Sequence, residues 1–335
     1  MGPWKHTLPP RGIAPSRAMP ARRVGRMSQH PAADAPRAKD PSARTQDLID
    51  MLQLADGGGA RTHEDIFVGR TLSAPRGRVY GGQVLAQSVT AAMRTVDPGW
   101  PIHSMHAYFL RAGDNEEPIT FGVERMRDGR SFATRRVHAY QFGRTIYSGI
   151  FSFQEPARGV EHQDTMPRGM PEPESLPTAD ELLGSMPLPA ARRVIERPFD
   201  IRYISRPLYL RPDPSAEPFN AVWVRTHTPL PDDPHLHQAA LAYVSDYVML
   251  EPALRRHGKT WVQDGVSMAS LDHAMWWHRP ARADEWLLYV QTSPSASGAR
   301  ALGEGRMFDR DGHLIATTMQ EGMMRFPEFR DGAEG

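Results

Sequence analysis

One carboxylate in the C-terminal half of the chain stands in apolar surroundings. Residues 238–254 read as a helix, and the residues one turn before and after Asp246 are apolar. A carboxylate in such surroundings is costly unless it has partners. Burial also tunes its pKa, which suits a catalytic base or a group that orients water. An ion pair with another helix or across an interface explains the same pattern, so both interpretations stay open.

A hydroxyl occurs at the start of the next segment, residues 268–278, which reads as a strand. Regular alternation places Ser270 and Asp272 on one face of this strand and His273 on the other. A serine hydroxyl donates to or accepts from a water molecule. An ordinary serine at the start of a strand is the simpler explanation, and the sequence alone does not exclude it.

An amide occurs in the last predicted strand, residues 313–325. Gln320 and Glu321 are neighbours there, so they point to opposite faces. An inward amide holds a water through its carbonyl oxygen and donates from its nitrogen. A solvated glutamine on the outer face is the commoner case for such a residue.

Other kinds of catalytic site find little support. The chain has no cysteine, which excludes cysteine nucleophiles, thiolate zinc sites and disulfides. We find no G-x-S-x-G elbow, Walker loop or dinucleotide fingerprint. The histidine pairs lack a third ligand, and the strand histidines fall on different faces if that strand is regular; they are His103 with His106, His235 with His237, and His273 with His278. We therefore expect no metal and no cofactor.

Two further features suit an anionic ligand or a developing negative charge. Gly81 and Gly82 open a predicted helix, where backbone N–H groups and the helix dipole favour an oxyanion. Plain turn chemistry explains these glycines equally well. A cluster of arginines lies across a predicted hairpin, where it would meet coenzyme A phosphates or simply form a solvated face; it comprises Arg125, Arg127, Arg130, Arg135 and Arg136.

These residues lie in two units of the same design, which indicates an internal repeat. In each unit a helix with few polar positions precedes a series of strands separated by turn signals. The first unit comprises a helix at 83–93 and strands at 103–110, 119–126, 132–142 and 145–154. The second comprises strands at 201–210 and 219–228, a helix at 238–254, and strands at 268–278, 285–292, 299–308 and 313–325. Arg111 corresponds to Arg279 and Ser131 to Ser297. The pattern predicts an α+β fold in which antiparallel sheets wrap central helices.

The rest of the chain differs in composition from these units. Residues 1–45 are rich in Pro, Arg, Ala and Ser, which predicts a disordered tail, although the arginines also resemble a transit peptide and Met27 is an alternative start. A short helix is expected at 46–54. Residues 156–195 are rich in proline and predict a linker. The expected division is therefore a tail at 1–45, repeats at 46–155 and 196–328, and the linker between the repeats.

Composition limits the partners. The 335 residues carry a formal net charge of only +1, so no global field attracts nucleic acid. No window approaches the ~18 consecutive apolar residues of a membrane span. The C-terminus lacks a Ser-Lys-Leu address, which favours a cytoplasmic location.

Several phrases, taken together and in order, resemble the type II acyl-CoA thioesterases, which are TesB-like proteins. The resemblance runs from about Phe67 to Arg325. The phrases in the first unit are VYGGQVLAQ at 79–87, HSMHAYFLR at 103–111 and RDGRSFATRRV at 127–137. Those in the second unit are LAYVSD at 241–246, SLDHAMW at 270–276 and QEGMMR at 320–325.

The resemblance implies a double hotdog fold, with two antiparallel sheets that each wrap a central helix. It also implies hydrolysis of fatty acyl-CoA to a free fatty acid and coenzyme A. Asp246, Ser270 and Gln320 match the family residues that position a water molecule, and backbone N–H groups at Gly82 and Gln83 are candidate oxyanion donors. Where relatives carry threonine, serine at position 270 keeps the hydroxyl and loses the methyl group.

Alternatives to this function remain at this stage. A non-catalytic hotdog protein that binds or senses acyl-CoA would need the same pocket without a productive water. Hydratase chemistry on an enoyl-CoA finds no paired Asp/His motif. The acyl chain length is open, and so is the choice between a monomer and a homo-oligomer.

Overall fold

The N-terminal half of the protein has the predicted order of a helix followed by an antiparallel meander. The computed structural model describes residues 40–57, 63–72, 77–184, 194–209, 211–261 and 263–329. Its first elements are α1 (Pro41–Leu52), β1 (Ala55–Asp56), β2 (Glu64–Gly69), α2 (Gly81–Met93), β3 (Ile102–Phe109), β4 (Ile119–Asp128), β5 (Phe132–Gln141) and β6 (Arg144–Gln154). Buried and accessible residues alternate along β5, as expected for a strand with one face against a core.

The C-terminal half repeats this order after a connecting segment. The segment contains η1 (Pro173–Ser175) and α3 (Ala179–Leu183), and the half continues with β7 (Phe199–Tyr203), β8 (Phe219–Thr226), α5 (Pro234–Ser245), α6 (Glu251–Arg256), β9 (Ser267–Ser270), β10 (Asp272–Trp277), β11 (Leu287–Ser297), β12 (Arg300–Phe308), β13 (Leu314–Arg325) and η2 (Pro327–Phe329). Burial alternates along β12 as it does along β5. The two halves therefore present matching inner faces.

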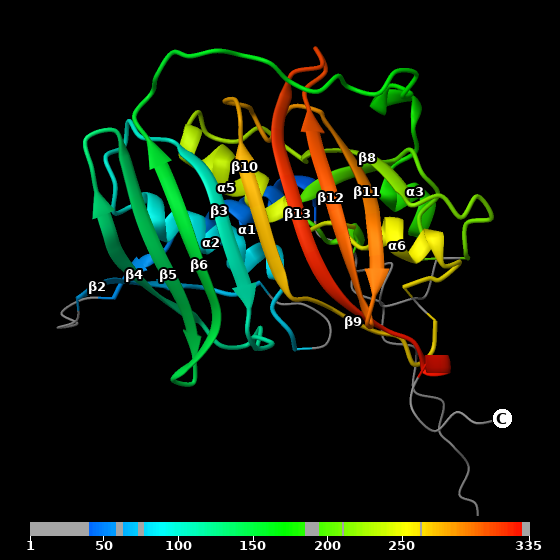
Figure 1. The fold of residues 1–335 in the computed structure, drawn as a ribbon, viewed down its shortest axis with the longest axis horizontal. Helices are drawn as coiled ribbons and strands as arrows, with labels where there is room; N and C mark the ends of the chain where they lie inside the picture. Colours follow the sequence, from blue (N-terminus) through cyan, green and yellow to red (C-terminus); the bar gives the residue numbers. More distant parts are fainter. Residues whose placement is uncertain are drawn as a thin grey trace, which may run out of the picture. The chain divides into compact units, whose positions relative to one another are not determined.

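All strands of the described residues belong to one antiparallel sheet. Its order is β1-β2-β4-β5-β6-β3-β10-β13-β12-β11-β8-β7, and β9 pairs with β13. The two halves meet where β3 pairs with β10, with Met105 opposite Met275. The α+β double hotdog class is thus confirmed, and the two expected sheets are joined edge to edge, with mirrored strand order on either side of the junction (Figure 1).

The core lies between this sheet and the two long helices, which Figure 1 shows behind the strands. α2 and α5 are buried on almost all sides, as their apolar sequences predict. They approach each other closely, because the Tyr80 hydroxyl donates to the Tyr243 carbonyl at 3.2 Å. A β-carbon on Gly82 would lie only 2.2 Å from that same carbonyl oxygen, so glycine permits this contact.

The repeat correspondence predicted from the arginines is visible in the backbone. The Arg111 guanidinium donates to the Thr145 carbonyl at 2.6 Å, and the Arg279 guanidinium donates to the Leu314 carbonyl at 2.9 Å. Thr145 and Leu314 occupy the same place at the start of β6 and β13. The serine pair corresponds less well, since Ser131 directly precedes β5 whereas Ser297 ends β11.

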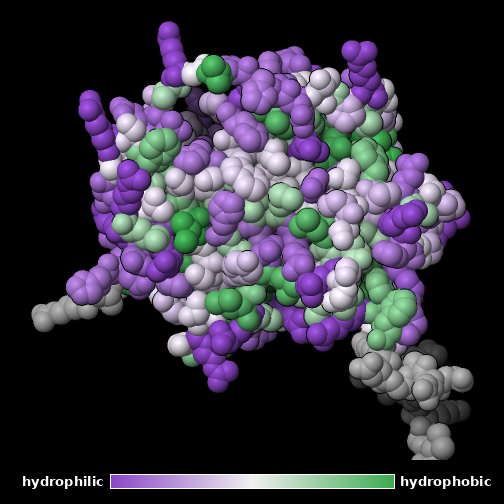
Figure 2. Space-filling model, in the orientation of Figure 1, coloured by the Kyte–Doolittle hydropathy of each residue, from purple (hydrophilic) through white to green (hydrophobic). Residues whose placement is uncertain are grey.

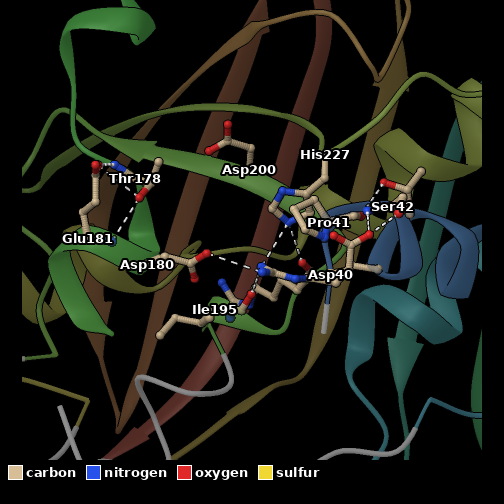
Figure 3. A network of polar contacts seen from close by, with 12 residues as sticks. Asp40, Pro41, Ser42, Thr178, Asp180, Glu181, Ile195, Asp200 and His227 are labelled. Carbon is tan, nitrogen blue, oxygen red and sulfur yellow. Dashed lines mark hydrogen bonds and ion pairs between the residues drawn. The ribbon is translucent and has the colours of Figure 1, made fainter. Parts of the chain in front are cut away.

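The first helix starts earlier than its sequence suggested. α1 begins at Pro41, with the Asp40 carboxylate accepting from the Ser42 N–H at 3.1 Å, so the predicted boundary at residue 45 falls inside a helix. The Arg44 side chain of this helix donates to Asp180 and to the Ile195 carbonyl of the connecting segment and lies 3.4 Å from His227. Figure 3 shows Asp180, Ile195 and His227 in this network. Periodicity within one segment does not reveal such a long-range partner. Residues 1–39 of the predicted tail lie outside the described residues.

The described part of the proline-rich connection packs on the C-terminal half. It passes over one end of the sheet in Figure 1 and brings the Pro171 carbonyl within 2.8 Å of the Trp223 indole N–H, which donates to it. Arg310 forms ion pairs with Glu172 and Glu174. The repeat limits 46–155 and 196–328 and the linker 156–195 remain predictions.

The outer face of the sheet is mixed in character. Figure 2 shows small separate hydrophobic areas among hydrophilic ones on this side. Among the described residues, no helix has the length and apolar composition to cross a membrane.

Gly303 provides a test of how the sheet supports the turn after α5. A β-carbon at this position would lie 2.4 Å from the Met249 carbonyl oxygen, which is backbone and cannot easily move. We expect Gly303→Ala to lower the free energy of unfolding by about 1–3 kcal/mol, measured by denaturant titration. Gly159→Ala is the control, because nothing lies within 4 Å of its β-carbon position. Equal stability of the two variants would contradict this account of the turn.

Candidate functional site

Asp246, Ser270 and Gln320 come together at one end of α5. The Gln320 side-chain nitrogen donates to Asp246 Oδ1 and to Ser270 Oγ, both at 2.9 Å. The Ser270 hydroxyl donates to the same carboxylate oxygen at 3.2 Å. Three side chains that are far apart in the sequence thus share hydrogen bonds.

Asp246 caps the end of a helix and does not lie within one. The predicted continuous helix at 238–254 is wrong, because α5 ends at Ser245 and α6 begins at Glu251. Between them Val248 has a φ of 54°, a left-handed value that interrupts a helix. Pro252 lacks the N–H that a continuous helix would need at that place.

Side chains of β11 hold the backbone on both sides of Asp246. The Tyr289 hydroxyl donates to the Ser245 carbonyl at 2.7 Å, and the Gln291 amide donates to the Tyr247 carbonyl at 2.8 Å. Buried backbone carbonyls at a helix end need such partners. The sheet therefore fixes the position of the carboxylate.

Ser270 reaches the site because of a β-bulge. Ser270 lies opposite Gly322, whereas Ala274 lies opposite Met319, so four steps on one strand match three on β13. The extra residue turns Ser270 to the inner face, where it contacts Gln320 together with His273. The predicted regular alternation, with Ser270 and His273 on opposite faces, is wrong for this reason.

Gln320 is oriented as its strand predicts. Its side chain is buried, whereas the Glu321 carboxylate lies on the outer face in an ion pair with Arg300. The Gln320 carbonyl oxygen lies 2.6 Å from His273 Nδ1, on the side away from Asp246. Both ends of the amide thus have partners.

The environment of Asp246 suits a base that works near neutral pH. Burial raises the pKa of Asp246 to about 6, while hydrogen bonds from Gln320, Ser270 and the Gly82 N–H act in the opposite direction. The residue as a whole is only partly buried. A pKa near the working pH gives a carboxylate that is ionised yet able to take a proton.

The amino end of α2 completes the site from the other half of the chain. The Gly82 N–H donates to Asp246 Oδ2 at 3.0 Å. Gln83 does not contact the three side chains: its N–H donates to the Tyr80 carbonyl at 3.1 Å, and its amide bonds to Arg70 and Leu72. Of the two candidate oxyanion donors, only Gly82 lies against the carboxylate.

Most of the arginine cluster is engaged within the protein. Arg135 is buried and donates to the Thr95 hydroxyl at 2.7 Å. Arg125 and Arg136 pair with Asp65 and Glu124. These three side chains support the hairpin, which favours the structural explanation for them.

One group of possible metal ligands occurs in the described residues. Asp309, Asp311 and His313 have ligand atoms within 4.8 Å of one another on the turn between β12 and β13. The Asp309 carboxylate accepts from the His313 N–H at 2.8 Å, so the group is explained as turn chemistry.

His273 is the site residue that the sequence did not reveal. The sequence suggests it only as a metal ligand, although regular alternation places it with Met275 and Trp277 on what is the buried face of β10. In the structure it is 1% exposed and lies between Gln320 and Ser245. No sequence signal predicts the bulge that brings Ser270 to this same face, so the common contact of both residues with Gln320 is not apparent from the sequence.

The corresponding positions of the N-terminal half carry different side chains. Matching the starts of β6 and β13 places Phe151 where Gln320 stands. The Leu110 N–H donates to the Ile146 carbonyl as the His278 N–H donates to the Ile315 carbonyl, both at 2.8 Å. Matching Leu110 with His278 therefore places Met105 where His273 stands. Arg94 caps α2 where Asp246 caps α5. The polar network therefore belongs to the C-terminal half.

The chain is similar to several known proteins. A family model for acyl-CoA thioesterases matches residues 201–323, and one for the acyl-CoA thioesterase N-terminal domain matches residues 71–154. Acyl-CoA thioesterase 2 of Haemophilus influenzae is 39% identical over 84% of this chain and 98% of its own length. Human acyl-coenzyme A thioesterase 8 is 38% identical over 78% and 85%, respectively. The crystal structure of acyl-CoA thioesterase II TesB2 from Mycobacterium marinum has 43% identity and a TM-score of 0.68, covering 85% of this chain and 99% of that one.

The raised pKa of Asp246 predicts a pH-dependent cost in stability. The folded state binds this proton more tightly than the unfolded state does, so the contribution of Asp246 is full below pH 4 and is lost as pH rises through about 6. Relative to wild type, Asp246→Asn should therefore gain stability as pH rises from 4 to 7, on the order of 3 kcal/mol. Denaturant unfolding of both proteins across this range measures the difference. A difference that stays constant with pH would contradict the raised pKa.

Proposed function

Because the chain belongs to the type II acyl-CoA thioesterase family and is a thioester hydrolase, we propose that it hydrolyses fatty acyl-CoA with Asp246, Ser270 and Gln320 directing one water molecule. The observation that supports these roles is the convergence of the three side chains. Ser270 Oγ and Gln320 Nε2 lie 3.2 and 2.9 Å from the same oxygen of Asp246.

In the proposed reaction, the water oxygen attacks the thioester carbonyl carbon while Asp246 accepts a proton from that water. Ser270 and Gln320 hold the water by hydrogen bonds in place of the contact that they make with each other in this structure, which limits the orientations of the water before attack. The carbon–sulfur bond then breaks, and the proton on Asp246 passes to the departing coenzyme A sulfur. The products are a free fatty acid and coenzyme A, without an acyl-enzyme.

Gly82 is the candidate donor to the developing oxyanion. Its N–H stands at the amino end of α2, where the helix dipole favours negative charge, and it lies beside Asp246. Once Asp246 takes a proton, its hydrogen bond with the Gly82 N–H weakens, and the oxyanion can then accept from this N–H. Gln83 would first have to leave the Tyr80 carbonyl. A cytoplasmic location and the oligomeric state stay predictions.

Replacement of the carboxylate tests the proposal directly. Purified protein with short, medium and long acyl-CoAs and a thiol-reactive dye should release coenzyme A. Asp246→Asn should lower kcat roughly 100- to 10,000-fold, because the amide cannot accept the proton from water. Asp309→Asn, on the turn between β12 and β13, should retain wild-type turnover.

The outcomes separate the alternatives. Wild-type turnover in Asp246→Asn would remove Asp246 from its role. Tight binding of acyl-CoA without thiol release at any chain length would support the non-catalytic binder or sensor in place of a hydrolase.

The pH profile is a second test. Since Asp246 must be ionised to accept a proton and its pKa is raised to about 6, kcat/KM should fall as pH drops through about 6. Initial rates between pH 5 and 8, with the fold monitored at each pH, give the profile. A flat profile across pH 6 in folded protein would contradict the role of base.

A further inference from the structure

His273 connects Gln320 to the end of α5 inside the core. Its Nδ1 lies 2.6 Å from Gln320 Oε1, and its Nε2 lies 2.9 Å from Ser245 Oγ. The ring is 1% exposed, so water does not compete for these nitrogens.

The chemistry of the amide determines which proton the ring carries. An amide oxygen only accepts, so His273 Nδ1 must carry the proton in this contact. Nε2 is then an acceptor, and the single proton of the Ser245 hydroxyl is shared between Nε2 at 2.9 Å and the Ala242 carbonyl at 2.8 Å. Burial lowers the pKa of His273 to about 4, which keeps the ring neutral at the pH of the proposed reaction.

A glutamine amide can be reversed with almost no change in shape, but here the two orientations differ in function. As observed, its NH₂ group donates to both Asp246 and Ser270. Reversed, its oxygen would face the Asp246 carboxylate, acceptor against acceptor, and the water would lose a donor.

We propose that His273 is a positioning residue that holds the Gln320 amide with its NH₂ group toward Asp246 and Ser270. This inference rests on the proposed function, in which that NH₂ group orients the water. Reversal of the amide would also bring its NH₂ group against the Nδ1–H of His273, donor against donor, so the ring opposes the unproductive orientation.

The contacts of His273 belong to a chain of hydrogen bonds that begins and ends at adjacent residues. Ser245 and Asp246 are consecutive residues, and the chain of hydrogen bonds leads from the Ser245 hydroxyl through His273 and Gln320 back to Asp246. Ser245, the last residue of α5, therefore contacts the His273 ring, and this ring orients Gln320, which is a hydrogen-bond partner of Asp246.

A comparison with the N-terminal half supports the link between the histidine and the glutamine. There Met105 replaces the histidine and Phe151 replaces the glutamine, next to a helix capped by Arg94 in place of an aspartate. The histidine and the glutamine are both present in the half with the carboxylate and both absent in the half without it.

Three substitutions separate positioning from packing. His273→Asn keeps an N–H donor near the place of Nδ1, His273→Gln keeps a polar group near the place of Nε2, and His273→Leu keeps neither. We expect the asparagine variant to keep kcat within roughly fivefold of wild type, and the other two to lose up to roughly 100-fold with little change in KM. His278→Asn is the matched control, since this exposed histidine contacts Thr317 instead.

The pH profile supplies a readout that packing alone would not move. Loss of the Gln320 donor removes an interaction that lowers the pKa of Asp246, so the acid limb of kcat/KM should move to higher pH in His273→Leu and His273→Gln. The other titratable groups that face the carboxylate are Arg197, Tyr80, Tyr243 and Tyr289. The tyrosines have raised pKa values and stay neutral over this range.

A double-mutant cycle with Gln320→Ala decides the matter. If His273 acts through Gln320, His273→Leu should lower kcat in wild type but not further in Gln320→Ala. Additive losses, equal losses in the asparagine and leucine variants, or wild-type kcat in His273→Leu would overturn the inference. If the leucine variant does not fold, the contrast of asparagine with glutamine carries the same test. Wild-type turnover in both Asp246→Asn and Gln320→Ala would instead overturn the proposed function itself.

Discussion

The burial of the Asp246 carboxylate is the constraint on which the site depends. A charged group at this depth is costly, and hydrogen-bond donors, together with the positive charge of Arg197, offset the cost. The donors come from three separate places: the Gly82 N–H at the start of α2, the Ser270 hydroxyl at the end of β9, and the Gln320 amide in β13. The carboxylate is therefore held only when the two helices and the sheet are assembled.

The site consequently needs both halves of the chain, although only one of them carries the polar side chains. The C-terminal half supplies Asp246, Ser270 and Gln320, and the N-terminal half supplies the end of a helix at Gly82. The contact is possible because α2 and α5 approach each other at a glycine. The mirrored sheet, joined where β3 meets β10, fixes this approach. Only the C-terminal unit thus carries the acid, while the N-terminal unit has Arg94 at the matching helix end.

The buried His273 fixes the orientation of the Gln320 amide without contacting the reacting atoms. Because it is neutral and enclosed, it can select one orientation of an amide without placing another charge beside the carboxylate. The pKa of Asp246 reflects a balance between burial, which raises it, and the donors, which lower it. Any residue that fixes a donor thereby influences the base.

Features that depend on local periodicity and on residue type were predicted correctly from the amino-acid sequence. Alternation correctly separated Gln320 from Glu321, the apolar composition of α2 predicted its burial, and the matched arginines at 111 and 279 revealed the repeat. Only the tertiary structure decided the end of α5 at Ser245 and the bulge that turns Ser270 inward beside His273. The reason is physical: strand register and helix termination depend on partner strands and distant side chains, and a one-residue offset leaves no mark on the periodicity of a single segment.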